Sequence, residues 1–171
     1  MADLFPTAFS FIMRPENDGQ GYHDTPGDAG GPTAWGVTAA TWRHWLAIHG
    51  SIGAEVPTSK EAAAPLYRSQ FWNACRCPNL GPCGIAVFDM AVTAGPSGAA
   101  RILQGVLGLP EDGDIGPKTV GAAQRLDNDV LNKRLLLARE VFYGSLNQPE
   151  FLHGWIRRAI DCHVLVTGLI K

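Results

Sequence analysis

The stretch RPENDGQGYHDTPGDAGGPTAWGVT, residues 14–38, separates two apolar helical patterns and decides the fold of the first half of the chain. Before it, apolar side chains recur at close to helical spacing over residues 4–14, and this pattern ends before Pro15. Glycine and proline exclude a regular helix over residues 19–36. The letters AWGVT then predict a short strand that leads to Thr38, the N-cap of the next helix. A small β-hairpin or ordered loop is therefore expected after the first helix.

The rest of the chain is predicted to be mainly helical. Residues 38–50 give a helix that ends at Gly50 and whose apolar face comprises Trp42, Trp45, Leu46 and Ile48. Thr58 and Glu61 predict a capping box for the next helix, which Pro65 bends or delays. Further helical segments are expected at residues 84–95, which are apolar enough to be central, at residues 97–109, from Pro117 at position N1, at residues 128–146 and at residues 149–166.

Length and composition indicate an ordinary folded protein. A chain of 171 residues suffices for one substantial core or two small lobes, and one compact unit is expected. Hydrophobic residues make up 46% and charged residues 18%, as in globular proteins. The formal charge of -2, without a dense run of Lys or Arg, argues against general nucleic-acid binding. A monomer is expected.

Neither end of the chain carries a membrane or export signal. Asp3 precedes the first apolar stretch and Pro6 lies inside it, unlike the basic-then-apolar plan of a secretory signal peptide. The longest apolar run, VLVTGLI at residues 164–170, is much too short to span a bilayer. A cytoplasmic protein without a membrane partner is expected.

The cysteines allow three interpretations. The segment CRCPNLGPC contains Cys75, Cys77 and Cys83, and Cys162 is followed by His163. The spacing of Cys75 and Cys77 is tighter than structural zinc sites use, so a zinc site is the weakest interpretation. One disulfide in an oxidising compartment and simple free thiols are the others. The histidines form no metal-binding pattern such as H-E-x-x-H, so no metal or other cofactor is expected.

Glu16 is the candidate catalytic acid. A glycosidase needs one carboxylic acid that stays protonated near neutral pH, and a second group that attacks the sugar or activates water. A carboxylate at the C-terminal end of an apolar helix meets partial burial and the negative end of the helix dipole, and both raise its pKa. Asp18, Asp24 and Asp28 follow in the loop. The alternative interpretation is that Glu16 is a solvated residue at a helix end and that the aspartates belong to ordinary turns.

A longer motif supports the catalytic interpretation. Glu16, Gly21-Tyr22 and DAGGPTAWGVT from Asp28 to Thr38 resemble the signature of glycoside hydrolase family 108, the lysozyme-like N-acetylmuramidases of phage endolysins and bacterial secretion-associated muramidases. The family usually has E-G-G-Y, whereas this chain has E-N-D-G-Q-G-Y, as though three residues were inserted. Glu16 remains the best match, and Asp18 is its rival.

The second half of the chain resembles the region usually paired with that hydrolase segment. FDMAVTAGP and DGDIGPKT match two elements of a region described as a predicted peptidoglycan-binding domain, and FLHGWIRRA matches its closing helix. The resemblance implies a catalytic segment at residues 1–80 and a helical peptidoglycan-binding region at residues 81–171, packed as one compact unit. A turn that feeds a helix would explain DGDIGPKT without any ligand, because Gly113 permits positive φ and Ile115 points inward.

The resemblance implies a mainly α, lysozyme-like fold and a muramidase that cleaves the β-1,4 bond between N-acetylmuramic acid and N-acetylglucosamine in bacterial peptidoglycan. Glu16 would donate the proton, and Asp28 or Asp24 would stabilise the transition state or orient water. Thr33 would hold the hydrolytic water or act as a structural hydroxyl, and Tyr22 and Trp35 would line sugar subsites or anchor the hairpin.

Three alternatives stay open. A lytic transglycosylase would act on the same bond through one Glu, and would leave a 1,6-anhydro end in place of a reducing end. A non-catalytic protein that binds the cell wall or assists secretion would bind murein without cleaving it. A zinc-dependent module would contain stoichiometric metal. The absence of a signal peptide favours an endolysin, which waits in the host cytoplasm until a holin-type lesion releases it to the periplasm.

Overall fold

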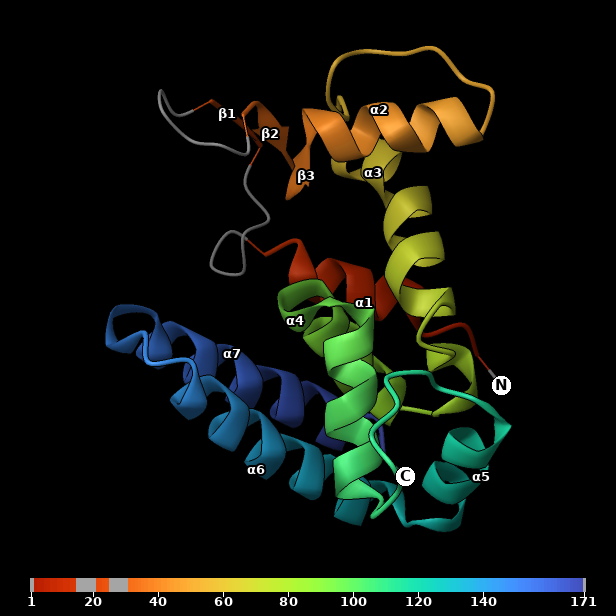
Figure 1. The fold of residues 1–171 in the computed structure, drawn as a ribbon, viewed down its shortest axis with the longest axis vertical. Helices are drawn as coiled ribbons and strands as arrows, with labels where there is room; N and C mark the ends of the chain where they lie inside the picture. Colours follow the sequence, from red (N-terminus) through yellow and green to blue (C-terminus); the bar gives the residue numbers. More distant parts are fainter. Residues whose placement is uncertain (1, 15–20, 25–30, 171) are drawn as a thin grey trace. The chain divides into compact units, whose positions relative to one another are not determined.

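The computed structural model describes residues 2–14, 21–24 and 31–170, and most of them are helical. In chain order the elements are α1 (Phe5–Ile12), β1 (Tyr22–His23), β2 (Thr33–Ala34), β3 (Val37–Thr38), α2 (Ala39–Ile48), α3 (Lys60–Tyr67), the π-helix η2 (Arg68–Asn73), the 3-10 helix η3 (Cys77–Asn79), α4 (Cys83–Val106), α5 (Pro117–Arg125), α6 (Asn128–Ser145) and α7 (Pro149–Thr167) (Figure 1). The predicted mainly α fold with a small β-element after the first helix is confirmed.

The chain divides into two compact units. The smaller unit comprises residues 9–68, and the larger unit comprises residues 1–8 together with residues 69–171. Within the described ranges, no helix has both the length and the hydropathy of a membrane-spanning segment.

The smaller unit contains a three-stranded antiparallel sheet in the order β1-β2-β3. Ala34 pairs with Val37, so Trp35 and Gly36 form the turn between β2 and β3. The sequence prediction of one strand over AWGVT is therefore wrong. Both turn residues have positive φ, 54° at Trp35 and 71° at Gly36, as a two-residue hairpin of matching twist requires.

Helix α2 begins and ends as predicted. The Thr38 side chain accepts a hydrogen bond from the backbone N–H of Thr41 at 3.2 Å, and Gly50 follows the helix with a φ of 62°. Trp42 and Trp45 are buried, but Ile48 is exposed, contrary to the predicted apolar face. Ile48 is the last residue of α2 and lies about 120° around the helix from Trp42.

Helix α3 starts one residue later than the predicted capping box. Its N-cap is Ser59, whose hydroxyl accepts from the N–H of Ala62 at 3.2 Å, and not Thr58. Pro65 lies inside α3 without ending it. The chain continues directly into the wider turn of η2, a form in which a helix can accommodate an irregular hydrogen-bond pattern.

Helix α4 is the centre of the larger unit. Residues 83–91 are buried without interruption, which confirms the prediction of a central helix over residues 84–95. Gly95, with a φ of 75° and a ψ of 158°, and Pro96 break the helical backbone and produce a kink. Helices α6 and α7 pack on each other and on α4 (Figure 1).

One buried carboxylate connects these three helices. Asp89 of α4 accepts hydrogen bonds from Arg139 of α6 and from Nε of Arg158 of α7, the latter at 2.8 Å, and all three residues are buried. Burial alone would lower the pKa of the Arg139 guanidinium, but the Asp89 carboxylate raises it, so the group stays charged. Tyr143 extends the network, because its hydroxyl lies 3.3 Å from both Arg139 Nη2 and Thr93 Oγ1.

The segment DGDIGPKT forms the turn before α5. The Gln104 side chain holds it, donating to the carbonyl of Asp114 at 2.9 Å and accepting from the N–H of Gly113 at 3.0 Å. Gly113 has a φ of 82°, Pro117 occupies N1, and Ile115 is buried. The predicted turn that leads into a helix is confirmed, and a direct contact of this segment with murein stays an open alternative.

Residues 161–170, which follow the closing-helix motif FLHGWIRRA, complete the core of the larger unit. Cys162 and Val166 in the last turns of α7 are fully buried. The buried Asn132 of α6 donates hydrogen bonds to the carbonyl of His163 and to the hydroxyl of Thr167, both at 3.1 Å. The end of the chain is thus fixed to α6 by packing and by polar contacts.

All four cysteines carry free, buried thiols. Burial raises the pKa of Cys75 to about 11 and those of Cys83 and Cys162 to about 12. These thiols are therefore neutral at physiological pH and poor nucleophiles.

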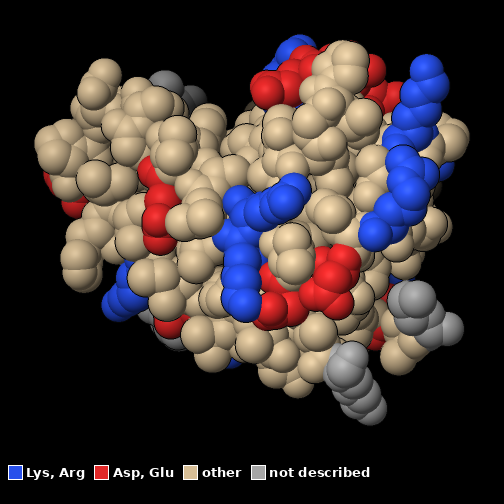
Figure 2. Space-filling model, turned by 90° about the horizontal axis from the view of Figure 1, so that it is seen from below, with Lys and Arg blue, Asp and Glu red and all other residues tan. Residues whose placement is uncertain are grey.

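Charged side chains of both signs lie beside each other on the face of the molecule shown in Figure 2. Wide uncharged areas separate the charged groups. This face lacks the single-sign field that attracts a polyanion.

Asp89→Ala should destabilise the larger unit by about 3–5 kcal/mol, because the substitution leaves two buried guanidinium groups without their counter-charge. Urea unfolding followed by circular dichroism measures the effect. Asp129→Ala, which removes the exposed ion pair with Lys133, is the control and should leave the midpoint unchanged. A variant of Asp89 as stable as the Asp129 variant would contradict the assignment.

Candidate functional site

The structure describes four of the six predicted site residues. Glu16 and Asp28 lie outside the described residues, as does Asp18, so their roles stay predictions. Asp24, Thr33, Tyr22 and Trp35 all belong to the smaller unit, in or beside its sheet.

The strand register sorts these four residues into two groups. His23 pairs with Thr33, so Asp24, which follows His23, lies at the same end of the sheet as Thr33. Tyr22 pairs with Ala34, and Trp35 follows Ala34, so these two aromatic residues lie at the opposite end. The sheet therefore has a polar end with Asp24 and Thr33 and an aromatic end with Tyr22 and Trp35.

At the polar end, Thr33 is buried and Asp24 is exposed. The Thr33 hydroxyl donates to the carbonyl of Gly31 at 3.0 Å, so its proton is already used within the loop. Its oxygen still has lone pairs that accept hydrogen bonds. A water molecule bound there must therefore donate to Thr33, which directs the lone pairs of the water elsewhere.

At the aromatic end, Tyr22 is 62% exposed, whereas Trp35 is half-buried. The position that a Cβ atom would take on Gly21 lies 4.0 Å from Cζ2 of Trp35, so this ring lies near the backbone of the segment before β1. Tyr22 thus offers an accessible ring face, and Trp35 combines hairpin packing with partial exposure.

Tyr67 of α3 fixes the hairpin turn, a role that the sequence did not indicate. Its hydroxyl donates to the carbonyl of Trp35 at 2.9 Å, and its ring lies 5.6 Å from the ring of Phe9 in α1. The Cβ position of Gly36 is only 2.6 Å from the Tyr67 hydroxyl oxygen, so any side chain at position 36 would collide with it. Tyr67 therefore connects the helix that precedes Glu16 with the turn that carries Trp35.

No cluster of three or more His, Cys, Asp or Glu side chains suited to a metal ion occurs among the residues that the structure describes. The side-chain polar atoms of the described sheet belong to Tyr22, His23, Thr33 and Thr38, and Asp24 directly follows β1. Such groups support acid–base chemistry and hydrogen bonding to a polar substrate.

The sequence model of the family described as glycosyl hydrolase 108 matches residues 9–95, more than half of the chain. The chain belongs to glycosyl hydrolase family 108. A second model, described as a predicted peptidoglycan domain, matches residues 98–160. In this member of family 108 the first match contains the whole sheet, α2 and α3, and the second contains α5, α6 and much of α7.

A solved structure agrees with this assignment. The structure of Brucella abortus SagA is similar to this family-108 chain with a TM-score of 0.78 and 31% sequence identity, over 98% of this chain and 94% of that one. The search of curated proteins gave no match. The two family matches together support a glycoside hydrolase that acts on peptidoglycan.

Gly36→Ala should destabilise the smaller unit by more than Gly50→Ala. Both glycines have positive φ, 71° and 62°, but only Gly36 faces an atom at contact distance, while the space around Gly50 is open. The strain alone costs about 1 kcal/mol, which is the loss expected for Gly50→Ala in urea unfolding.

Adding Tyr67→Phe to Gly36→Ala removes the colliding oxygen and should recover part of the lost stability. Equal losses for the two glycine variants, or no recovery in the double variant, would show that Tyr67 does not constrain the turn.

Proposed function

We propose that the chain is an N-acetylmuramidase that hydrolyses the β-1,4 bond between N-acetylmuramic acid and N-acetylglucosamine in peptidoglycan. The observation that carries the proposal is the family-108 match over residues 9–95, a range that includes Glu16 and the three-stranded sheet. The peptidoglycan domain matched by residues 98–160 supports the choice of polymer.

In this proposal Glu16 is the general acid. Its place in the sequence, four residues after the last residue of α1 and ahead of β1, is that of the acid in the family signature. The protonated carboxyl group donates its proton to the glycosidic oxygen as the bond to the sugar breaks. Asp18, two residues later, is the less favoured candidate for the same role.

Asp28 is proposed as the second carboxylate, and Asp24 as its alternative. The second carboxylate stabilises the oxocarbenium-like transition state or orients the attacking water. Thr33 supports a role in holding that water, because its free lone pairs accept a hydrogen bond at the end of the sheet where β1 leads into Asp24.

Tyr22 and Trp35 are proposed to line the sugar subsites. Pyranose rings present C–H groups on their faces, and aromatic rings bind such apolar faces while leaving the hydroxyl groups to polar neighbours. The exposure of Tyr22 at the aromatic end of the sheet supports this role.

The proposal assigns catalysis and murein binding to different segments of the chain, and places the protein in two compartments in succession. Residues 1–80 contain the catalytic groups, and residues 81–171 hold the enzyme on murein. As an endolysin, the protein would accumulate in the host cytoplasm and reach the periplasm through a holin-type lesion.

Glu16→Gln should lower the release of reducing ends from purified murein about a hundred- to ten-thousand-fold, because the amide cannot donate the required proton. Glu55→Gln is the matched control: the same change on an exposed carboxylate of the smaller unit, expected to retain full activity. Circular dichroism checks that both variants fold. Substantial activity in the folded Glu16 variant would refute the assignment.

Mass analysis of the wild-type products distinguishes the chemical alternatives. Hydrolysis at this bond leaves a reducing N-acetylmuramic acid end. Fragments with 1,6-anhydro ends would instead identify a lytic transglycosylase, and binding to murein without any fragments would identify a non-catalytic wall-binding protein.

Asp28→Asn should reduce kcat on murein more than Asp24→Asn does, because Asp28 begins the family motif that ends at Thr38. Steady-state release of reducing ends measures both variants. A larger loss for Asp24→Asn would transfer the role of the second carboxylate to Asp24.

A further inference from the structure

Helix α6 carries an exposed apolar ridge on the larger unit. Leu137 is 61% and Val141 is 75% exposed, and Val130 is exposed two turns before Leu137. These positions follow the helical repeat along one side of α6, together with Arg134 and Gly144. Apolar side chains grouped in this way on a soluble protein mark an interaction surface.

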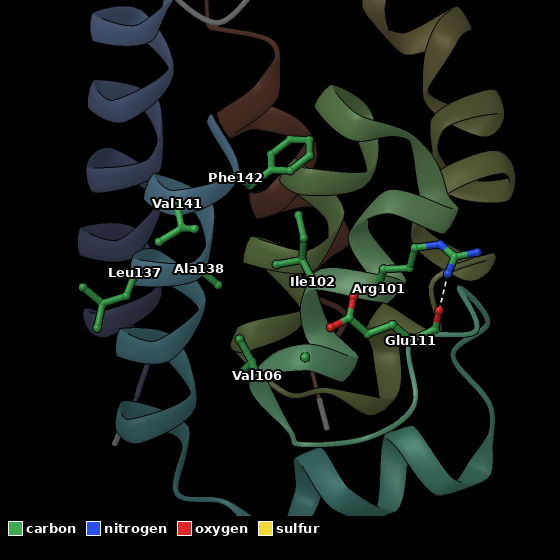
Figure 3. Close-up of a pocket in the computed structure, with 9 residues that line it drawn as sticks. Arg101, Ile102, Val106, Glu111, Leu137, Ala138, Val141 and Phe142 are labelled. Carbon is green, nitrogen blue, oxygen red and sulfur yellow. Dashed lines mark hydrogen bonds between the residues drawn. The ribbon is translucent and has the colours of Figure 1, made fainter. Parts of the chain in front are cut away.

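The ridge borders a hollow of about 370 Å³ between α6 and the second half of α4. Figure 3 shows Ile102 and Val106 of α4 on one side, and Leu137, Ala138, Val141 and Phe142 of α6 on the other. Arg101 donates a hydrogen bond to the backbone carbonyl of Glu111 at the far rim. The ridge and the hollow thus lie on the same face, and Leu137 and Val141 of α6 belong to both.

We infer, in contrast to the monomer expected from the sequence, that this face binds a second copy of the chain, with α6 antiparallel to the α6 helix of its partner. A two-fold axis passes through Leu137, so that Leu137 meets the partner's Leu137. A two-fold interface requires one surface that is complementary to itself. The apolar side of α6 meets this condition when it packs on the same side of the partner's α6, and the hollow beside it extends the apolar surface of this face.

The sequence of α6 fits this register on both sides of Leu137. Arg134 lies three residues before Leu137 and Glu140 three residues after it, so the axis sets Arg134 opposite the partner's Glu140, and this contact occurs twice. Within the described structure neither side chain has an ion pair or hydrogen-bond partner of its own. Charged pairs beside an apolar seam select helix partner and orientation in coiled coils.

The outer positions of the seam are also complementary. Val130 lies seven residues before Leu137 and Gly144 seven residues after it, so Val130 packs over the partner's Gly144, around which the space is open. Val141 meets the partner's Lys133, whose aliphatic stem covers apolar surface. The seam from Val130 to Gly144 is about 21 Å long at 1.5 Å per residue.

A protein surface suits this hollow better than a sugar polymer. The lining residues are mainly aliphatic, with charge confined to the rim formed by Arg101 and Glu111. A glycan has hydroxyl and amide groups that need hydrogen-bond partners when they leave water, and the α4 and α6 walls offer none. The inference does not depend on the proposed muramidase activity, since the face involves neither Glu16 nor the sheet.

Analytical ultracentrifugation of the full chain over about 1 to 500 μM tests the inference. The 18.3 kDa chain should shift reversibly to twice its mass as concentration rises. Leu137→Glu should weaken dimerisation at least tenfold. Val164→Glu, at a position of α7 with a matching 63% exposure outside this face, should leave it unchanged. A wild-type chain that stays monomeric throughout, or equal effects of the two variants, would overturn the inference.

A charge exchange tests the register itself. Arg134→Glu and Glu140→Arg should each weaken the dimer by opposing like charges, and the double variant should restore it. Failure of the double variant to recover would rule out this antiparallel register. Muramidase activity measured on the same samples reports separately on the proposed function. If the wild-type chain is monomeric and Leu137→Glu loses murein binding, the face belongs to a cell-wall site and the dimer is ruled out.

Discussion

The larger unit depends on a single buried carboxylate that pairs with two guanidinium groups. Asp89 connects α4 with Arg139 of α6 and Arg158 of α7, and removing Asp89 would leave both guanidinium groups buried without a counter-charge. Such a network contributes specificity of packing more than net stability, because desolvation offsets much of the attraction. Its hydrogen bonds link α4, α6 and α7 in the interior of the larger unit.

The smaller unit depends on a steric constraint of a different kind. A bulky tryptophan in the left-handed region is strained, and the turn holds it there because the Tyr67 hydroxyl binds its carbonyl and leaves no room for a side chain at Gly36. This turn sets the register of β2 and β3. Because β1 pairs with β2, the turn also influences the positions of Tyr22 and Asp24. The geometry of the candidate site is therefore determined by residues that need not touch a substrate.

Local signals in the sequence predicted most of the fold. Thr38, Gly50, Gly113 and Pro117 specify helix ends and turns through their own backbone preferences, so their roles are visible without knowledge of the neighbours. The errors arose where two adjacent residues had similar local preferences, as with Thr58 and Ser59, or where a two-residue turn was concealed within an apolar run.

Tertiary partners were not predictable in this way. Asp89 lies 50 residues from Arg139 and 69 from Arg158, and Tyr67 lies 32 residues from Trp35, distances over which helical periodicity carries no information. For the candidate site, strand register adds the grouping of Asp24 with Thr33 and of Tyr22 with Trp35. The assignments of Glu16 and Asp28 rest on the motif, whose residues are recognisable because their spacing is unusual.

The last turns of α7 show that a conserved sequence segment and a folding unit need not end together. The match to the peptidoglycan domain stops at residue 160, yet Cys162 and Val166 fill the interior and the backbone at His163 binds Asn132. A fragment cut at the boundary of the match would lose its own interior lining and leave a buried amide without acceptors. Fusions or domain exchanges that build on this module should therefore keep α7 whole and attach new segments beyond it.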